Sequence, residues 1–326
     1  MWPPEAKIKV KTLKEAVSHF IHDDCHISFG GFTVNRQPMA CAYEMVRQEK
    51  KNLHVYMHSG GQALDILIGA GCVKAAEIAY GANGRFAPTC VRFRKAVERG
   101  ELLVEDYSNY QMTLRFQAGA MGVPFLPVKS GMGTDIVKKW GFSAEMRHKD
   151  PGLPDQKLII QNNPFAGKDQ EPVVLVPAIN PDVTILHVQQ ADFQGTVRIS
   201  GLTFADVEQA RAAKHVIITC EELVDPGVLR AEPDRNHIPF FAVDAVVHVP
   251  YGAHPCACYG CYDYDAQHLN LYRKMAVDDE KFSAYLDEYV LGVDNHQEYL
   301  DKIGTEALER IRAVDPYGYA PGLKRG

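Results

Sequence analysis

The sequence predicts an α/β protein with an open, mostly parallel sheet and helices on both faces. Two observations lead to this prediction. Hydrophobic segments of strand length alternate with amphipathic segments of helix length, and four of the early strand-like segments end in glycine, serine, asparagine or acidic residues. Ligands of such sheets bind beyond the carboxyl ends of the strands. We therefore expect the functional residues at these strand ends.

The first 121 residues show this alternation most clearly. Strands are expected at residues 25–29, 53–57, 73–80 and 102–104, and helices at residues 12–20, 38–47, 63–68, 90–97 and 111–121. Thr12 and Glu15 form a capping box that opens the first helix. Pro38 suits the first turn of the second helix. Gly69 and Gly71 end the third.

The rest of the chain is predicted to contain an excursion, further strands and a helical tail. Residues of about 129–172 have weaker periodicity and several prolines and glycines, so they are interpreted as a lid or a partner-binding arm. Strands are expected at residues 173–176, 183–186, 216–219 and 245–249, and an amphipathic helical tail at about 266–326. A turn with Gly195 in the left-handed region is expected at residues 192–196. Residues 1–326 are expected to form one domain.

Composition excludes several classes of function. The net charge of -6 argues against nucleic acid as the main partner. No window approaches about 18 consecutive apolar residues, so we expect no membrane span. The first residues lack the apolar core of a signal peptide. Eight cysteines are scattered without a disulfide framework, which favours reduced thiols and a cytoplasmic location.

Familiar cofactor and metal motifs are absent or incomplete. The glycine pairs Gly69/Gly71 and Gly131/Gly133 each lack the third glycine of a dinucleotide fingerprint. There is also no phosphate-binding loop and no G-x-S-x-G elbow. We therefore expect no tightly bound cofactor.

One cluster could bind zinc. His254, Cys256, Cys258 and Cys261 lie within eight residues, and three thiols with an imidazole can form a tetrahedral zinc site. The spacing is cramped, however, and there is no distant second ligand pair. A loop of small buried thiols is the favoured interpretation, and no metal is expected.

The predicted binding residues lie at the strand ends: Gly30, Gly31, Phe32, Ser59, Gly60, Gly61, Gln62, Asn83, Arg85, Ser108 and Asn109. Glycine turns let a ligand approach the backbone, and their amides can bind an anion. The alternative is ordinary tight turns. Glu105 and Asp106 are acid/base candidates. Their alternative role is to favour the dipole of a following helix.

The order of short motifs along the chain resembles a known family. The motifs are Gly30–Phe32, Lys74–Tyr80, Arg92–Lys95, Glu105–Ser108, Pro124–Val128, Asn163–Phe165, His187–Ala191, Gly195–Ile199, Thr219–Glu222, Val243–Val246, Pro250–Pro255 and Tyr262–Asp265. Each motif is weak, but their order from about residue 12 to 303 is specific. The chain thus resembles the A subunits of class I CoA-transferases, in particular the glutaconate type.

This resemblance implies an open α/β fold, with an active site between this chain and a homologous B subunit. CoA would move between an acyl-CoA and a small dicarboxylic acid, with a thioester as substrate. The attacking glutamate of the family lies in a Ser-Glu-Asn-Gly motif of the B subunit. The nearest string here, residues 81–84, has alanine in place of that glutamate. This chain is therefore expected to contribute substrate binding and oxyanion stabilisation by the glycine-loop amides. An assembly of four A–B pairs is also implied.

Two segments depart from the glutaconate type. The glycine/alanine run at residues 58–62 is shorter, and residues 129–133 are more similar to ring-opening CoA-thioester hydrolases. The alternative function is therefore an acyl-CoA hydrolase, lyase or decarboxylase on the same two-subunit scaffold. In that case Glu105 or Asp106 would act as the base. An effector-binding domain is disfavoured because too few residues precede the first strand for a DNA-binding module.

Overall fold

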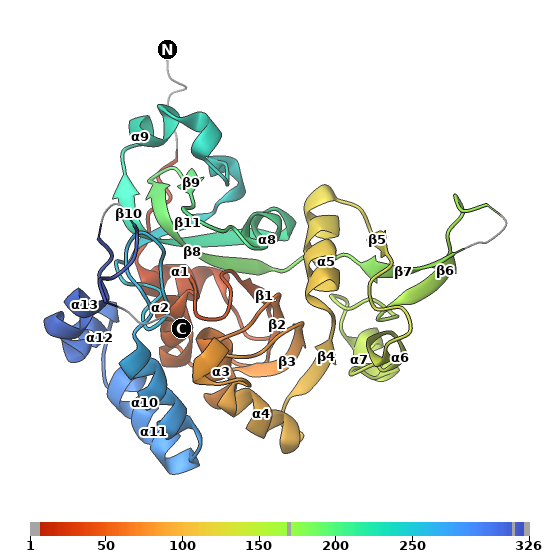
Figure 1. Cartoon of the computed structure of the whole chain (residues 1–326), viewed down its shortest axis with the longest axis horizontal. Helices are drawn as coiled ribbons and strands as arrows, with labels where there is room; N and C mark the ends of the chain where they lie inside the picture. The colour runs from red at the N-terminus through yellow and green to blue at the C-terminus, as the bar shows by residue number, and fades with distance from the viewer. Residues whose placement is uncertain (1–6, 168–170, 315–316, 323–326) are drawn as a thin grey trace.

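The computed structural model describes residues 7–167, 171–314 and 317–322. Its centre is one large sheet, seen nearly edge-on in Figure 1. The strand order is β11 (Ala245–His248), β10 (His215–Val224), β8 (Val183–Asp192), β1 (His26–Phe29), β2 (Leu53–Met57), β3 (Val73–Ile78) and β4 (Leu103–Asp106), and β9 (Val197–Arg198) pairs with β8. Only β9 runs antiparallel to its neighbour. The predicted open, mostly parallel sheet is confirmed.

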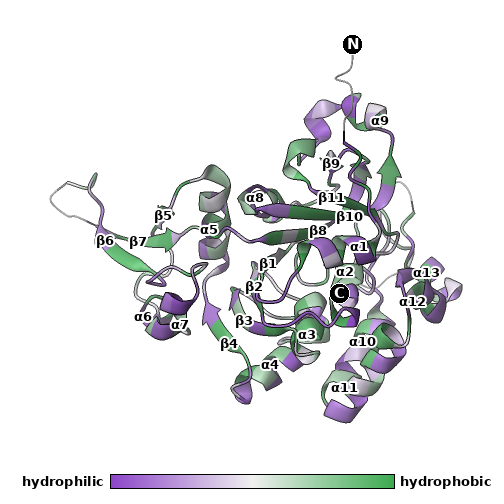
Figure 2. Cartoon of the chain, turned by 180° about the vertical axis from the view of Figure 1, so that it is seen from behind, coloured by the Kyte–Doolittle hydropathy of each residue, from purple (hydrophilic) through white to green (hydrophobic). Residues whose placement is uncertain are grey.

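Helices cover both faces of this sheet, as predicted. One face packs against α1 (Leu13–Phe20), α2 (Met39–Arg47), α3 (Gln62–Gly69), α4 (Val91–Glu98), α10 (Ala266–Ala276), α11 (Asp279–Leu286), α12 (His296–Ile303) and α13 (Thr305–Ile311). The other face packs against α5 (Asn109–Met121) and α8 (Asp206–Ala212). In Figure 2 the strands at the centre of the sheet are largely green, whereas the outer helices contain many purple residues.

Strand β2 shows how the two faces differ. Val55 and Met57 join the large core beneath α1–α4. Their neighbours His54 and Tyr56 point to the opposite face, because side chains alternate along a strand. His54 is only 3% exposed although it is polar. At β2 this second face therefore carries polar groups that need hydrogen-bond partners.

A second, antiparallel sheet begins before the predicted excursion and ends after it. Its strands are β5 (Phe125–Val128), β7 (Pro172–Pro177) and β6 (Ile159–Asn162), in that order, and two short helices, α6 (Asp135–Lys138) and α7 (Ala144–Lys149), lie between β5 and β6. Figure 1 shows this unit projecting from the main sheet beyond α5. The sequence predicted only the strand that became β7, because the short segments here lack a clear period.

Three further boundaries differ from the predicted ones. Strands β8 and β10 extend six and five residues beyond the predicted ends at 186 and 219, while β3 stops at Ile78 rather than residue 80. The extension of β8 includes buried polar residues. His187 Nδ1 lies 2.9 Å from Thr219 Oγ1, and Gln189 Nε2 donates to the carbonyl of Ser200. Hydropathy patterns miss strand residues that are buried through hydrogen bonds.

Two local predictions are confirmed. Thr12 and Glu15 form the capping box of α1. At the 192–196 turn, Asp192 Oδ1 accepts hydrogen bonds from the amides of Gln194, Gly195 and Thr196, and Gly195 has a φ of 102°. Single-residue propensities are sufficient for such short-range features.

Helices α10–α13 form most of the predicted tail, and residues 315–316 and 323–326 of that tail lie outside the described part of the chain. The remaining short helices are α9 (Pro226–Arg230), η1 (Gly84–Phe86), η2 (Pro233–Arg235), η3 (Phe240–Ala242) and η4 (Asp287–Leu291). Among the described helices, none combines the length and apolarity required to cross a bilayer.

The buried His268 of α10 predicts that acid destabilises the fold. Its Nε2 lies 2.8 Å from the hydroxyl of Tyr285. Burial, followed by repulsion from His254, lowers the pKa of His268 to about 3. The neutral imidazole is favoured in the fold, so this stabilisation is complete above about pH 6.5 and is lost as the pH falls toward the folded pKa.

As the pH is lowered, we expect the free energy of unfolding to decrease less steeply in His268→Asn than in the unmodified protein. The difference should reach about 2–3 kcal/mol between roughly pH 6.5 and pH 4. Urea unfolding at several pH values measures it. The control is His148→Asn, since His148 is exposed on α7. Equal slopes for His268→Asn and the unmodified chain would contradict the prediction.

Candidate active site

The loop after β1 is tight and strained. Gly31, Thr33 and Arg36 have φ values of 79°, 53° and 48°. A Cβ atom on Gly31 would lie 2.4 Å from the carbonyl oxygen of Asn35, so only glycine fits there. Positive φ at Thr33 and Arg36 costs energy that the surroundings must offset, and such strain concentrates at functional sites.

Asp206, in the first turn of α8, holds this loop. Its Oδ1 accepts a hydrogen bond from the amide of Gly31 at 2.9 Å, and its Oδ2 lies 2.5 Å from Arg36 Nη1. The guanidinium also donates to the carbonyls of His187 and Leu202. Arg36 is 2% exposed and Asp206 is fully buried. A buried ion pair with this many partners fixes the loop against the ends of β8 and α8.

The loops after β2 and β3 pack against the loop after β1. The amide of Thr33 donates to the carbonyl of Ser59, and the amide of Gly60 donates to the carbonyl of Tyr80. A Cβ atom on Gly61 would lie 2.2 Å from the carbonyl oxygen of Thr33. Three strand-end loops that the sequence singled out are therefore contiguous at the carboxyl edge of the sheet.

Gln62 and Asn83 form a buried pair beside these loops. Asn83 Nδ2 donates to Gln62 Oε1 at 2.7 Å. Gln62 Nε2 and Asn83 Oδ1 are buried and have no hydrogen-bond partner among the residues that the structure describes. Buried polar atoms normally have partners. The pair thus holds one donor and one acceptor that no described residue satisfies.

Ser59, Ser108, Asn109 and Phe32 surround the same edge. Ser59 Oγ lies 3.3 Å from Asn109 Oδ1 and 3.2 Å from His58 Nδ1. Ser108 caps α5, since its Oγ accepts from the amide of Gln111. Phe32 stacks on Phe204, with ring centroids 5.0 Å apart. Arg85 points elsewhere: its Nη2 donates to the hydroxyl of Tyr264.

Four of the backbone amides that the sequence predicts as anion donors are occupied within the chain. Gly30 donates to the carbonyl of Ile185, Gly31 to Asp206, Phe32 to the carbonyl of Asn35, and Gly60 to the carbonyl of Tyr80. An amide has one proton, so these four offer none to a ligand in this conformation. Among the described residues, Gln62 and Asn83 each have a buried side-chain atom without a partner near this edge, and so does Gln37, whose Nε2 donates to the carbonyl of Gly30.

The acid/base candidate Glu105 has a structural role. It is fully buried, and its carboxylate pairs with Arg147 of α7 and accepts from the amides of Gly141 and Phe142. These contacts occupy the carboxylate in this conformation, and the acid/base role of Glu105 stays a prediction. Asp106 is exposed and lies 3.3 Å from the buried ammonium of Lys157. These two residues connect β4 to the excursion.

The four residues that the sequence offered as a zinc site are not arranged around one common position. His254 Nδ1 lies 2.6 Å from the hydroxyl of Tyr299, and its Nε2 lies 3.3 Å from Asp265, so both ring nitrogens have partners. Cys256 and Cys258 are buried, as the favoured interpretation predicted, whereas Cys261 is partly exposed. In the described residues, potential ligand atoms instead approach within 4.8 Å in the groups His26/His54/Asp150 and His187/Glu221/Cys258.

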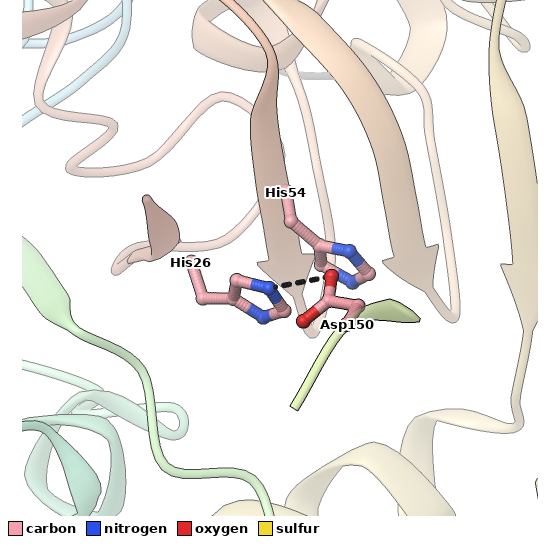
Figure 3. A group of neighbouring side chains, drawn as sticks. All are labelled: His26, His54 and Asp150. Atoms are coloured by element: carbon pink, nitrogen blue, oxygen red, sulfur yellow. Dashed lines mark hydrogen bonds and ion pairs between the residues drawn. The ribbon is translucent and has the colours of Figure 1, made fainter. Parts of the chain in front are cut away.

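The first group, drawn in Figure 3, lies at the amino edge of the sheet, because His26 begins β1 and His54 is the second residue of β2. The rings of His26 and His54 are stacked, with centroids 4.4 Å apart and planes 3° from parallel. His26 Nε2 lies 2.9 Å from Asp150, and His54 Nε2 lies 3.0 Å from Glu77. Parallel rings direct their lone pairs side by side rather than toward one ion. We interpret the group as a hydrogen-bonded stack that ties the excursion to β1 and β2.

A cavity of about 690 Å³ opens beside this histidine stack. Its lining includes Asp24, Asn52 and Asp182, which precede β1, β2 and β8. Burial, and then the charge of His54, lower the pKa of His26. In open parallel sheets the ligand site lies at the carboxyl edge. We therefore place the candidate active site at the glycine loops rather than in this cavity.

Comparisons with known proteins agree with this architecture. The family model described as "Coenzyme A transferase" matches residues 10–249. The A subunit of glutaconate CoA-transferase from Acidaminococcus fermentans is 43% identical over 95% of this chain and 97% of its own. Its crystal structure has a TM-score of 0.92 and covers 96% of this chain, which covers 98% of that chain. The A subunit of 3-oxoadipate CoA-transferase from Pseudomonas knackmussii is 35% identical over 90% of this chain and 97% of its own.

The chain therefore belongs to the coenzyme A transferase family. It is the A subunit of a two-subunit CoA-transferase, an enzyme class whose substrates are CoA thioesters. Relatives with other activities are more distant. The cholesterol ring-cleaving hydrolase IpdA subunit of Rhodococcus jostii is 26% identical over 86% of this chain and 92% of its own. The decarboxylase AibA/AibB has a TM-score of 0.68 at 30% identity, with 85% of this chain and 98% of that chain covered.

Sequence reasoning missed Arg36 and Asp206. Their ion pair joins residues 170 positions apart, and no local pattern links them. The one available signal was an aspartate in the first turn of a helix, which by itself indicates only a favourable interaction with the helix dipole.

The packing of the glycine loops predicts the effect of Gly61→Ala. The added methyl group would overlap the carbonyl of Thr33, so one of the two loops must move. We expect a loss of about 1–3 kcal/mol of stability, measured by thermal unfolding. Gly167→Ala is the control, because a Cβ atom at Gly167 meets nothing within 4 Å. A Gly61→Ala variant as stable as the control would refute this packing argument.

Proposed function

We propose that this chain, together with a homologous B subunit, moves CoA between an acyl-CoA and a small, glutaconate-like dicarboxylic acid in the cytoplasm. Two relatives support this substrate class. The Acidaminococcus fermentans relative is named for glutaconate and the Pseudomonas knackmussii relative for 3-oxoadipate, and both acids are dicarboxylates. The observation that carries the proposal is the similarity to the glutaconate enzyme along nearly the whole chain.

We assign substrate binding to this chain and covalent chemistry to the B subunit. The B-subunit glutamate attacks the thioester carbonyl and displaces CoA as a thiolate. The thiolate then attacks the resulting anhydride, which releases the first acid and leaves CoA on the glutamate. The second acid takes the CoA by the reverse steps. Splitting the transfer in this way replaces one difficult reaction with easier ones.

The unpartnered atoms of Gln62 and Asn83 are the proposed contacts for substrate. Gln62 Nε2 can donate to a carboxylate or thioester oxygen, and Asn83 Oδ1 can accept from an amide of the CoA arm. Ser59 and Asn109 extend the polar rim next to them. Gly30, Gly31, Gly60 and Gly61 let the strand-end loops pack closely against neighbouring parts of the chain, and the amide of Gly61 stays a proposed oxyanion donor. The assembly is proposed to contain four A–B pairs and no tightly bound cofactor.

The proposal predicts exchange only when both subunits are present. The chain is purified with its B subunit, then mixed with acetyl-CoA and glutaconate, and glutaconyl-CoA is measured by chromatography. Borohydride reduction after incubation with acyl-CoA should modify one B-subunit glutamate and no residue of this chain. Release of free CoA without exchange would instead indicate a hydrolase. Full activity of the isolated chain would refute the division of labour.

Gln62→Ala tests the role of the buried pair in substrate binding. Loss of one hydrogen bond to substrate should lower kcat/KM by about fivefold to tenfold, equivalent to roughly 1–1.5 kcal/mol. Gln117→Ala, an exposed glutamine on α5, is the matched control. Thermal unfolding of both variants distinguishes an effect on substrate binding from an effect on folding. An unchanged kcat/KM in a folded Gln62→Ala enzyme would exclude this contact.

A further inference from the structure

Cys258 and Cys261 occupy the ends of a tight turn. The amide of Cys261 donates to the carbonyl of Cys258 at 2.9 Å, and Gly260 has a φ of 83° between them. Such a turn brings its first and last Cα atoms within about 7 Å. Disulfides span Cα distances of about 4.4–6.8 Å, so the turn has the required dimensions.

The two thiols are free and differ in exposure. They lie close enough for Cys261 to contribute, after burial, to the raised pKa of the Cys258 thiol. Cys258 is buried, while Cys261 is partly exposed beside the exposed turn residues Tyr259 and Gly260. A solution oxidant can therefore reach Cys261 first, with a second thiol in place behind it. This is the arrangement of an attacking and a resolving cysteine.

We propose that Cys258 and Cys261 form a reversible disulfide, a redox modification site that acts on the loop at residues 31–36. The effect on activity rests on the proposed function of that loop. Formation of the disulfide does not depend on that function.

The oxidant is a low-molecular-weight disulfide such as oxidised glutathione. The Cys261 thiolate attacks one sulfur of the oxidant, so the oxidant's S–S bond breaks and one thiolate leaves. Cys258 then attacks the Cys261 sulfur, which forms the internal S–S bond and releases the second thiolate. The two cysteine protons end on the two released thiols. Two cysteines are oxidised, and one disulfide is reduced to two thiols.

The neighbourhood of Cys258 can assist the second step. Potential ligand atoms of His187, Glu221 and Cys258 lie within 4.8 Å of one another. The Glu221 carboxylate can therefore take up the proton of Cys258 as its sulfur attacks. Burial raises the pKa of the Cys258 thiol, so Cys258 is suited to the resolving role rather than the attacking role.

The turn is joined directly to the strained loop after β1. Ala257, the residue before Cys258, donates to the carbonyl of Val34 at 2.8 Å and accepts from the amide of Arg36 at 2.7 Å. A disulfide brings the two sulfurs to about 2.05 Å, closer than any thiol contact. Movement of Cys258 toward Cys261 is therefore transmitted through Ala257 to the loop that carries Gly31 and Arg36.

The first experiment is chemical and needs no activity. The chain with its B subunit is incubated with excess oxidised glutathione, remaining thiols are alkylated, and peptides are analysed by mass spectrometry. We expect one peptide with Cys258 and Cys261 joined, lighter by two hydrogen atoms and restored by a reducing agent. Cys25→Ser is the matched control, since Cys25 is also free and partly exposed, and it should leave the disulfide unchanged.

Three results would overturn the proposal. They are a stable glutathione adduct on Cys261 with Cys258 still reduced, two unmodified thiols, and a stoichiometric metal ion that protects both thiols. Cys261→Ser should abolish the disulfide, and as a change at a partly exposed position it avoids the folding risk of replacing Cys258.

The second experiment measures regulation. Oxidation should change kcat/KM several-fold in the unmodified enzyme and leave Cys261→Ser unaffected. Formation of the disulfide without any change in activity would remove the regulatory part of the proposal. Absence of CoA transfer in the reduced enzyme would instead count against the proposed function, so the two failures are distinguishable.

Discussion

The carboxylate of Asp206 is the constraint on which the carboxyl edge of the sheet depends. It satisfies the Gly31 amide and neutralises the Arg36 guanidinium, both away from water. Removing it would leave a buried charge without a partner, which costs several kcal/mol. The strained conformation of the loop after β1 depends on this carboxylate, which lies in the first turn of α8. The loops after β2 and β3 in turn pack against that loop.

The main sheet was predictable because its signals are local. Buried runs such as residues 53–57 are mostly apolar and bounded by turn residues, and the structure ends β2 at that boundary. The later strands β8 and β10 were underestimated, since polar residues such as His187 continue them while remaining buried. The small sheet of the excursion was missed because strands β5 and β6 are short and largely exposed.

The contacts at the candidate site were only partly predictable. Glycine at strand ends indicated the carboxyl edge, and Gln62 and Asn83 do meet there. The Gly31 amide donates its hydrogen bond to Asp206, which lies 175 residues later in the chain. The role of Glu105 likewise depends on Arg147, which lies 42 residues further along. Partners so distant in the chain leave no trace in a local motif.

Strand β6 has a consequence for the behaviour of the chain in isolation. It is the outer strand of the small sheet, and every one of its residues is exposed, including Ile159 and Ile160 at 45% and 55%. Within the described residues, β6 is paired along one side only. A bare, partly apolar backbone edge is a template for strand addition. Without a cover, the free polypeptide would therefore be prone to edge-to-edge self-association through this strand.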